Sequence, residues 1–149
     1  MSWLRFSFES KLDEIFLVSL VLRQVCTHIG LDEILAYQVE LCAIEAVTNS
    51  VRHALHEQPG NEVTVLIRFD DAKIDLQILD CGASMPPTYV ERLKHGSQVL
   101  NFDPSDIQAL PESGMGLQII HDFMDEAVYT SNGGVNCLRL MKLLRRTEI

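Results

Sequence analysis

Fold and site are both indicated by the stretch Glu45-Ala46-Val47-Thr48-Asn49, which is followed along the chain by Asp80-Cys81-Gly82 and Ser113-Gly114-Met115-Gly116-Leu117. Residues four apart on a helix project from the same side, so the first stretch pairs the carboxylate of Glu45 with the amide of Asn49. The second stretch ends an apolar strand pattern with an acid and a glycine. The third puts two glycines at the start of an apolar helix pattern. In this order the three stretches predict a pocket for an adenine nucleotide bound with magnesium.

Glu45 and Asn49 lie beside the apolar positions of their predicted helix and therefore at the margin of the core. A carboxylate next to an amide oxygen suits a hydrated Mg2+ held through phosphates, because that ion keeps several waters and takes few protein ligands. The carboxylate can also accept a proton from an attacking hydroxyl or water. The alternative is that both are ordinary polar residues on the exposed side of an amphipathic helix.

Asp80 and three glycines add a base site and a phosphate site to this pocket. An acid at a strand end can accept a hydrogen bond from the exocyclic amine of adenine, and Gly82 lets the base come close to the backbone. Gly114 and Gly116 let backbone N–H groups converge on phosphate oxygens at a helix N-terminus, which favours negative charge. The alternatives are a strand-to-turn aspartate and a flexible loop end.

Composition and charge describe an ordinary folded chain. Its 149 residues are 47% hydrophobic and 22% charged, which is enough for a sizeable core in a single domain over residues 1–149. The net charge of -9 argues against nucleic acid and against an anionic membrane surface as partners. The longest apolar run, 15–22, is too short to cross a bilayer, and the N-terminus shows no secretory signal pattern. None of the four cysteines form a C-x-x-C pair, so we expect reduced, mostly buried thiols and a cytoplasmic protein.

Periodicity predicts an alternation of strands and helices with one long irregular stretch. That stretch covers residues 96–113 and holds two prolines; loops of this length in a compact domain are usually functional lids or disordered. Apolar residues at period two predict strands over 3–8, 63–69, 74–78, 127–130 and 136–144. Helical spacing predicts helices over 11–28, 32–56, 88–94 and 116–125.

The first two helices carry more specific expectations. Ser10 with Asp13 resembles a capping box, and Asp32 is a candidate cap for the second helix. The second helix has an apolar stripe at positions three and four apart: Leu41, Ile44, Thr48, Val51 and Leu55. The first helix is apolar almost all the way round and needs cover on more than one side. Together with an exposed first strand at the sheet edge, this predicts a homodimer.

The three motifs, taken in order, resemble those of the GHKL ATPase superfamily, and within it those of the anti-sigma-factor serine kinases of bacterial partner-switching systems. Residues 44–50 with His53 resemble the N box of that family, and Leu79-Asp80-Cys81-Gly82 resembles its G1 box. Residues 113–117 with the following Phe123-Met124-Asp125 resemble its G2 box and helix. The resemblance covers about residues 5–144.

The resemblance implies an α+β fold: a two-layer α/β sandwich of the Bergerat, histidine kinase-like type, with a mixed, mostly antiparallel sheet and an ATP lid. It implies ATP and Mg2+ as ligands, Glu45 as the catalytic base and Asn49 as the magnesium residue. It places further residues around the nucleotide: His53, Asp80, Gly82, Gly114, Met115, Gly116 and Leu117. It implies a serine of a STAS-type anti-sigma-factor antagonist as the phosphate acceptor, and a sigma factor as a second partner.

Two positions depart from the family pattern. Glu112 stands where a basic residue usually precedes the Ser-Gly-Met-Gly run, and a carboxylate there repels a triphosphate. Val135 stands where the last strand usually opens with threonine, and Asn136 is a candidate substitute for the missing hydroxyl. These departures bear on catalytic rate more than on nucleotide binding. They keep open a second function, a nucleotide-dependent module that captures a sigma factor or another partner stoichiometrically with little catalysis.

Overall fold

The structure is a computed structural model that describes residues 3–96 and 114–144. A short 3-10 turn, Leu12–Glu14, precedes the first long helix, and a five-residue π-helix, Ser50–Ala54, continues the second. The strands are β1 (Leu4–Glu9), β2 (Glu62–Phe69), β3 (Lys73–Asp80), β4 (Glu126–Asn132) and β5 (Val135–Leu143). The helices are α1 (Ile15–His28), α2 (Glu33–Asn49), α3 (Pro87–His95) and α4 (Gly114–Phe123).

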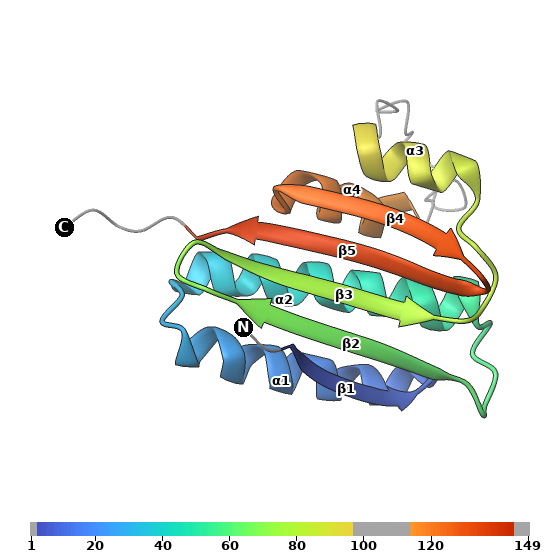
Figure 1. Cartoon of the computed structure of the whole chain (residues 1–149), viewed down its shortest axis with the longest axis horizontal. Helices are drawn as coiled ribbons and strands as arrows, with labels where there is room; N and C mark the ends of the chain where they lie inside the picture. Colours follow the sequence, from blue (N-terminus) through green and yellow to red (C-terminus); the bar gives the residue numbers. More distant parts are fainter. Residues whose placement is uncertain (1–2, 97–113, 145–149) are drawn as a thin grey trace, which may run out of the picture.

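The five strands form one sheet in the order β1-β2-β3-β5-β4 (Figure 1). Hairpins join β2 to β3 and β4 to β5, and β5 is inserted between β3 and β4, so Asp80 pairs directly with Asn136. The predicted α+β fold is confirmed. All four strand pairs are antiparallel. The sheet of the described residues is therefore entirely antiparallel, whereas the resemblance implied a mixed, mostly antiparallel sheet.

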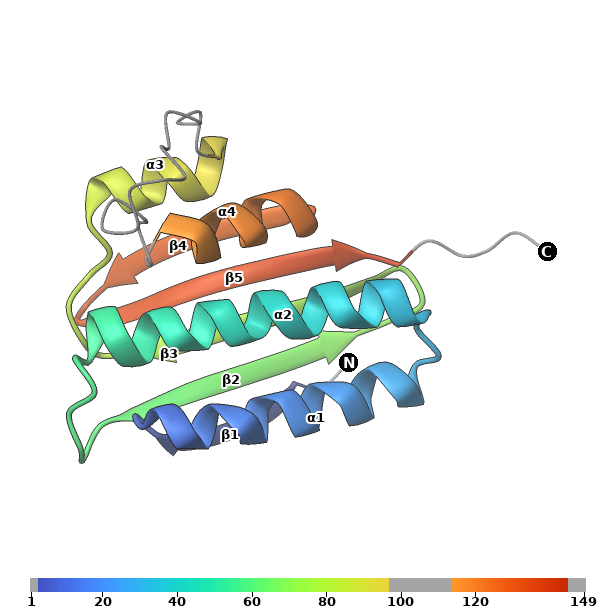
Figure 2. The same ribbon diagram turned by 180° about the vertical axis from the view of Figure 1, so that it is seen from behind.

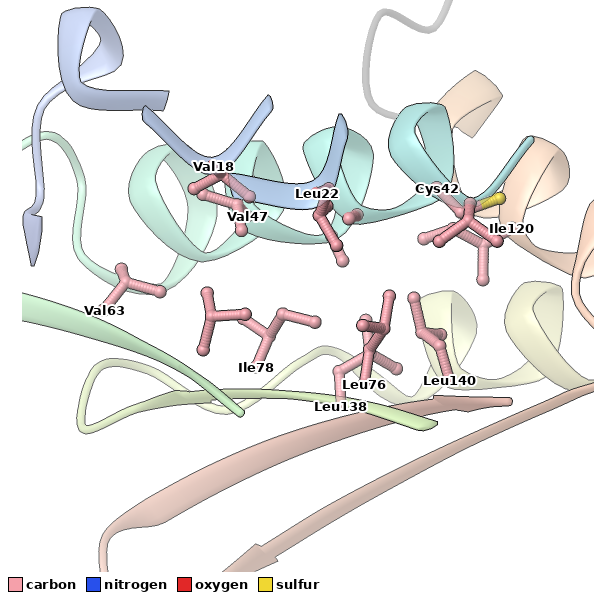
Figure 3. Packing of buried hydrophobic residues seen from close by; sticks show 14 of the residues in the cluster. Val18, Leu22, Cys42, Val47, Val63, Leu76, Ile78, Ile120, Leu138 and Leu140 are labelled. Atoms are coloured by element: carbon pink, nitrogen blue, oxygen red, sulfur yellow. The ribbon is translucent and has the colours of Figure 1, made fainter. Parts of the chain in front are cut away.

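Helices α1, α2 and α4 cover one face of the sheet, with α2 between the other two, and α3 lies next to α4 beyond the β4 edge (Figure 2). Alternate strand residues point into this layer, as the period of two requires. They meet apolar residues of the three helices in a core with almost no solvent exposure (Figure 3). Labelled members of that core are Val18, Leu22, Cys42, Val47, Val63, Leu76, Ile78, Ile120, Leu138 and Leu140.

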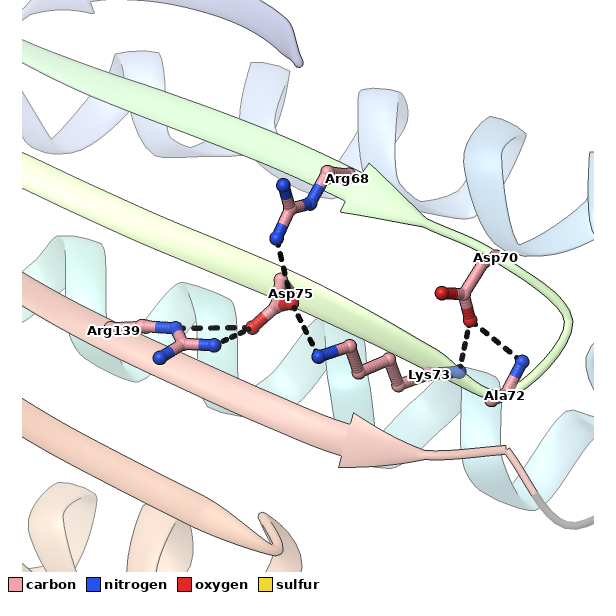
Figure 4. Close-up of polar contacts among 6 residues, drawn as sticks. All are labelled: Arg68, Asp70, Ala72, Lys73, Asp75 and Arg139. Carbon is pink, nitrogen blue, oxygen red and sulfur yellow. Dashed lines mark hydrogen bonds and ion pairs between the residues drawn. The ribbon is translucent and has the colours of Figure 1, made fainter. Parts of the chain in front are cut away.

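The opposite face of the sheet carries no helix in the described part of the chain and is polar at its centre (Figure 1). The Asp75 side chain there is only 1% exposed and accepts two hydrogen bonds at Oδ1 from Arg139, from Nη2 at 3.0 Å and Nε at 3.2 Å. Its Oδ2 lies 3.7 Å from Nη2 of Arg68 and 3.6 Å from Nζ of Lys73 (Figure 4). A buried carboxylate is tolerated because its cationic partners surround it.

The apolar stripe predicted for the second helix is wrong in its first half. Leu41, Ile44 and Thr48 are only partly buried, on the side of α2 away from the sheet. The buried side is instead made of smaller residues: Val39, Cys42, Ala43, Ala46 and Val47. The helix carries two apolar stripes, and the sheet packs against the one with the smaller side chains.

The capping predictions had different outcomes. Asp32 caps α2 as expected, because its carboxylate accepts a hydrogen bond of 2.9 Å from the Leu35 amide. The capping box at Ser10 and Asp13 is wrong. The Ser10 amide donates to the Asn61 carbonyl at 2.9 Å, and its buried Oγ has no partner among the described residues. Ser10 therefore continues the pairing at the end of β1 and does not cap the following helix.

The remaining global expectations concern membranes and thiols. Within residues 3–96 and 114–144, no helix is both long enough and apolar enough to span a bilayer. All four cysteines are free thiols. Cys26 and Cys42 are buried, and burial raises the pKa of the first to about 11 and of the second to about 12. Cys81 is exposed and Cys137 is half-buried, so two of the four thiols are buried where the sequence predicted that most would be.

Candidate functional site

Two adjoining hollows lie at the C-terminal end of α2. The first, called the β3 hollow, is lined by Asn49, Ser50, His53, Ala54, Asp80, Ala83, Ser84, Met85, Pro86, Tyr89, Tyr129, Asn136 and Leu138. The second, called the α4 hollow, is lined by Glu45, Thr48, Asn49, Arg52, His53, Gly116 and Leu117. Asn49 and His53 line both. The two hollows therefore bring together residues of α2, of the first turn of α4 and of the end of β3.

A π-helix carries His53, one of the two residues shared by the hollows. The Leu55 amide donates to the Ser50 carbonyl at 3.0 Å, five residues back, so the turn is wider than an α-helical one. Wide turns of this kind occur frequently at functional sites. This one carries Arg52 and His53, and the His53 ring meets the Tyr89 ring edge-on at 6.3 Å between centroids. The second helix thus ends by presenting polar and aromatic groups to the hollows.

Asp80 is held in one orientation at the end of β3. It is 7% exposed, and its Oδ1 accepts hydrogen bonds from the Gly82 amide at 3.0 Å and from Asn136 Nδ2 at 2.7 Å. Both bonds go to Oδ1, and none of the described residues donates to Oδ2. Because Asp80 lines the β3 hollow, its Oδ2, which has no protein donor, is suited to a donor on a ligand, such as an exocyclic amine.

Asn136 organises this end of the site. It is 3% exposed, and besides Asp80 its Nδ2 donates to the Gly82 carbonyl at 3.0 Å. Its Oδ1 accepts from the Ser131 hydroxyl at 2.7 Å. Val135 is 44% exposed and lies on the other face of the sheet, as the alternation along a strand requires. The departure at Val135 therefore does not touch the β3 hollow. Asn136, which sequence analysis named only as a candidate substitute for the missing hydroxyl, faces Asp80.

Gly82 has a packing reason as well as the one inferred from sequence. A Cβ at this position would lie 2.5 Å from the Ala54 carbonyl carbon and 2.8 Å from Leu55 Cδ2. The next amide, of Ala83, donates to the Ala54 carbonyl at 2.9 Å. The chain after β3 is thereby fastened to the end of the second helix, and only glycine permits the approach.

The first turn of α4 lies against the Glu45 side chain. A Cβ at Gly116 would lie well under 3.0 Å from Glu45 Oε2 and 3.3 Å from its Cδ. Leu117 lines the α4 hollow but is 1% exposed and belongs to the core. Met115 is 60% exposed and lines neither hollow. The helix starts at Gly114 and ends at Phe123, two residues earlier at each end than predicted.

Several lining residues were missed by sequence analysis. Arg52 is the only lysine or arginine among the described residues that line the two hollows, and its place three residues after Asn49 on the helix could have indicated it. Tyr129 accepts a hydrogen bond of 2.8 Å from the Met85 amide and walls the β3 hollow. Nothing in its strand pattern distinguishes it from a core residue. Of the irregular stretch predicted over 96–113, the structure describes only Gly96, at the end of α3; Glu112 and Ser113 lie outside the described residues.

Comparison with known proteins agrees with this geometry. Residues 8–142 match the family described as histidine kinase-like ATPase domain, so the chain belongs to that family. The serine-protein kinase RsbW of Bacillus cereus is 25% identical to it over 140 residues, which cover 94% of this chain and 84% of that protein. The proteins of the same name from Bacillus mycoides and Bacillus thuringiensis are each 24% identical, with the same coverage. The predicted resemblance is confirmed at the level of the family.

Proposed function

We propose that this chain is an ATP-dependent serine-protein kinase of a bacterial partner-switching pathway. The observation that carries the proposal is that Asn49 and His53 line both hollows. One elongated ligand can therefore reach from a buried hydrogen-bond acceptor, Asp80, to a carboxylate, Glu45. A nucleotide has this polarity, with a donor on its base and anionic oxygens at its other end.

The side chains present fit Mg·ATP. Adenine would lie in the β3 hollow, with its amine donating to Asp80 Oδ2 beside Tyr89 and Tyr129. The phosphates would lie toward the first turn of α4, residues 114–117, where the helix N-terminus favours negative charge. Asn49 would hold Mg2+ through its amide oxygen, and the ion would supply neutralisation of the charge on the transferring group. Among the described residues no cluster of three His, Cys, Asp or Glu competes as a metal site.

The reaction is in-line transfer of the terminal phosphoryl group. A serine hydroxyl oxygen of the acceptor protein forms the new bond to phosphorus, and the bond between phosphorus and the bridging oxygen breaks to leave ADP. Glu45 accepts the hydroxyl proton. Arg52 is a candidate cation for the charge that develops on the phosphoryl oxygens, since it lines the same hollow as Glu45.

The acceptor that we propose is a serine of a small STAS-type anti-sigma-factor antagonist, and the second partner is a sigma factor. The support is the motif resemblance together with relatives named serine-protein kinase. A cytoplasmic location follows from those partners. The most direct test incubates the protein with γ-labelled ATP and a cognate antagonist. Label transfer that is lost in Glu45→Ala supports the kinase, and no transfer, with Glu45→Ala behaving like wild type, refutes it.

A second candidate is stoichiometric capture of a partner by a nucleotide-bound module with little catalysis. Glu112 favours it, because an acid stands in sequence next to the phosphate-binding run. Retention of Glu45 disfavours it, because binding alone needs no base. Nucleotide affinity measured alongside turnover separates the two: tight Mg·ATP binding without ADP release supports capture.

We also propose that the protein is a homodimer. Three apolar side chains of α1 are open to solvent, Phe16 at 62%, Leu17 at 45% and Leu20 at 42%, and β1 is an edge strand. Exposed apolar groups gathered on one helix and an unpaired strand edge are typical of interfaces. Sedimentation at tens of micromolar checks this, and a monomer that is unchanged by Phe16→Glu would contradict it.

A further inference from the structure

At the site, α4 lies against α2 where Gly116 faces the Glu45 side chain. The two helices pack side by side over the sheet (Figure 2). A Cβ built on Gly116 would meet Oε2 of Glu45 first, then its Cδ at 3.3 Å and its Cβ at 3.6 Å. All three nearest atoms belong to Glu45. The place that a side chain at 116 would occupy is thus taken by the carboxylate proposed to act as the base.

We propose that Gly116 is a positioning residue for Glu45. Because glycine has no Cβ, the Glu45 carboxylate has space to lie against the first turn of α4. The inference rests on the proposed function, which gives Glu45 the task of accepting the proton. It differs from the role inferred from sequence, in which glycines at this turn let backbone N–H groups approach phosphate oxygens. The two roles predict different consequences for the same substitution.

The kind of atom that a new methyl group would meet determines those consequences. At Gly82 the methyl would meet the Ala54 carbonyl, which is backbone and can move only with the end of the second helix. At Gly116 it would meet the end of a flexible side chain. Gly116→Ala therefore leaves the fold intact and pushes the carboxylate away by about 1 Å or more, to an ordinary van der Waals distance.

A displacement of that size acts on chemistry and not on nucleotide binding. Misplacing a catalytic group by about 1 Å can cost 100-fold in rate. We expect Gly116→Ala to lower the rate of ADP release from Mg·ATP by about 100-fold. We expect its calorimetric affinity for Mg·ATP to stay within about twofold of wild type, because the three atoms nearest to the new methyl group all belong to Glu45.

A four-variant cycle on the full chain tests the assignment: wild type, Gly116→Ala, Glu45→Asp and the double variant. The shorter aspartate removes the overlap with the new methyl group. The double variant should therefore lose much less turnover than the product of the two single losses. Multiplicative losses would overturn the inference. Unchanged turnover in Gly116→Ala would also overturn it. So would a loss of Mg·ATP affinity with AMP affinity retained, because that result is expected if Gly116 serves to let backbone N–H groups approach the phosphates.

A readout that needs no turnover separates this inference from the proposed function. If the wild-type protein neither binds nor hydrolyses Mg·ATP, the proposed function fails. The carboxyl 13C resonance of Glu45, assigned by comparison with Glu45→Gln, still reports the surroundings of this carboxylate next to Gly116 in the ligand-free protein. A shift of that resonance in Gly116→Ala with unchanged thermal unfolding supports the positioning role, and an unshifted resonance refutes it.

Discussion

Removal of the Asn136 side chain should weaken both the fold and the nucleotide site. The amide is 3% exposed; it donates to Asp80 Oδ1 at 2.7 Å and to the Gly82 carbonyl at 3.0 Å, and it accepts from Ser131 at 2.7 Å. The bond to the charged carboxylate contributes roughly 1.5–3 kcal/mol and each neutral bond roughly 0.5–1.5 kcal/mol. Asn136→Ala should therefore lower the free energy of unfolding by about 3–5 kcal/mol, a large part of the roughly 5–15 kcal/mol of an ordinary domain.

The same substitution releases Asp80 from one of its two orienting hydrogen bonds. The carboxylate is then no longer fixed with Oδ2 toward the ligand, and binding free energy is lost. Each 1.4 kcal/mol of binding free energy lost lowers the affinity about tenfold. We expect a loss of about tenfold or more for Mg·ATP. Denaturant unfolding measures the stability, and calorimetry below the unfolding transition measures the affinity. Asn132→Ala, at the exposed end of β4, is the matched control and should change neither.

Asn136→Asp separates the hydrogen bonds from the shape. This variant keeps the size of the side chain but replaces the donor to Asp80 with a second carboxylate. At neutral pH we expect this variant to lose at least as much stability and Mg·ATP affinity as Asn136→Ala, because like charges at hydrogen-bond distance repel. Unchanged stability and affinity in both variants would refute the assigned role of Asn136.

Three further predictions follow from other parts of the structure. Gly82→Ala should lower the free energy of unfolding by about 3 kcal/mol or more in denaturant titration, because its methyl group meets backbone that cannot swing away. Arg139→Met should lower the free energy of unfolding by about 3 kcal/mol in the same assay, because Asp75 is left buried with only two distant cations. An unchanged unfolding midpoint would contradict this. At pH 8, thiol titration of the native protein should show fast reaction at the exposed Cys81 and none at the buried thiols of α1 and α2. Burial raises the pKa of those two to about 11 and about 12, so they stay protonated; three fast thiols would refute this.

Local patterns predicted the elements better than their environments. Every strand and helix of the described residues overlaps its predicted range, because periodicity and caps such as Asp32 are properties of neighbouring residues. The buried side of α2 could not be predicted, because the helix has two apolar stripes and only packing selects one. Ser10 was misread for a similar reason: its amide bonds to Asn61, fifty-one residues away, and not to the helix that follows it.

The chemical groups of the site and their order could be read from the amino-acid sequence, because helix spacing and strand ends are local geometry. Tertiary packing determined what each group meets. Asn136 faces Asp80 only because β5 is inserted beside β3, and Gly82 is required because the second helix ends against it. Gly116 lies against Glu45 because α4 packs beside α2. These contacts join residues 28 to 71 positions apart, and no short-range pattern encodes such a distance.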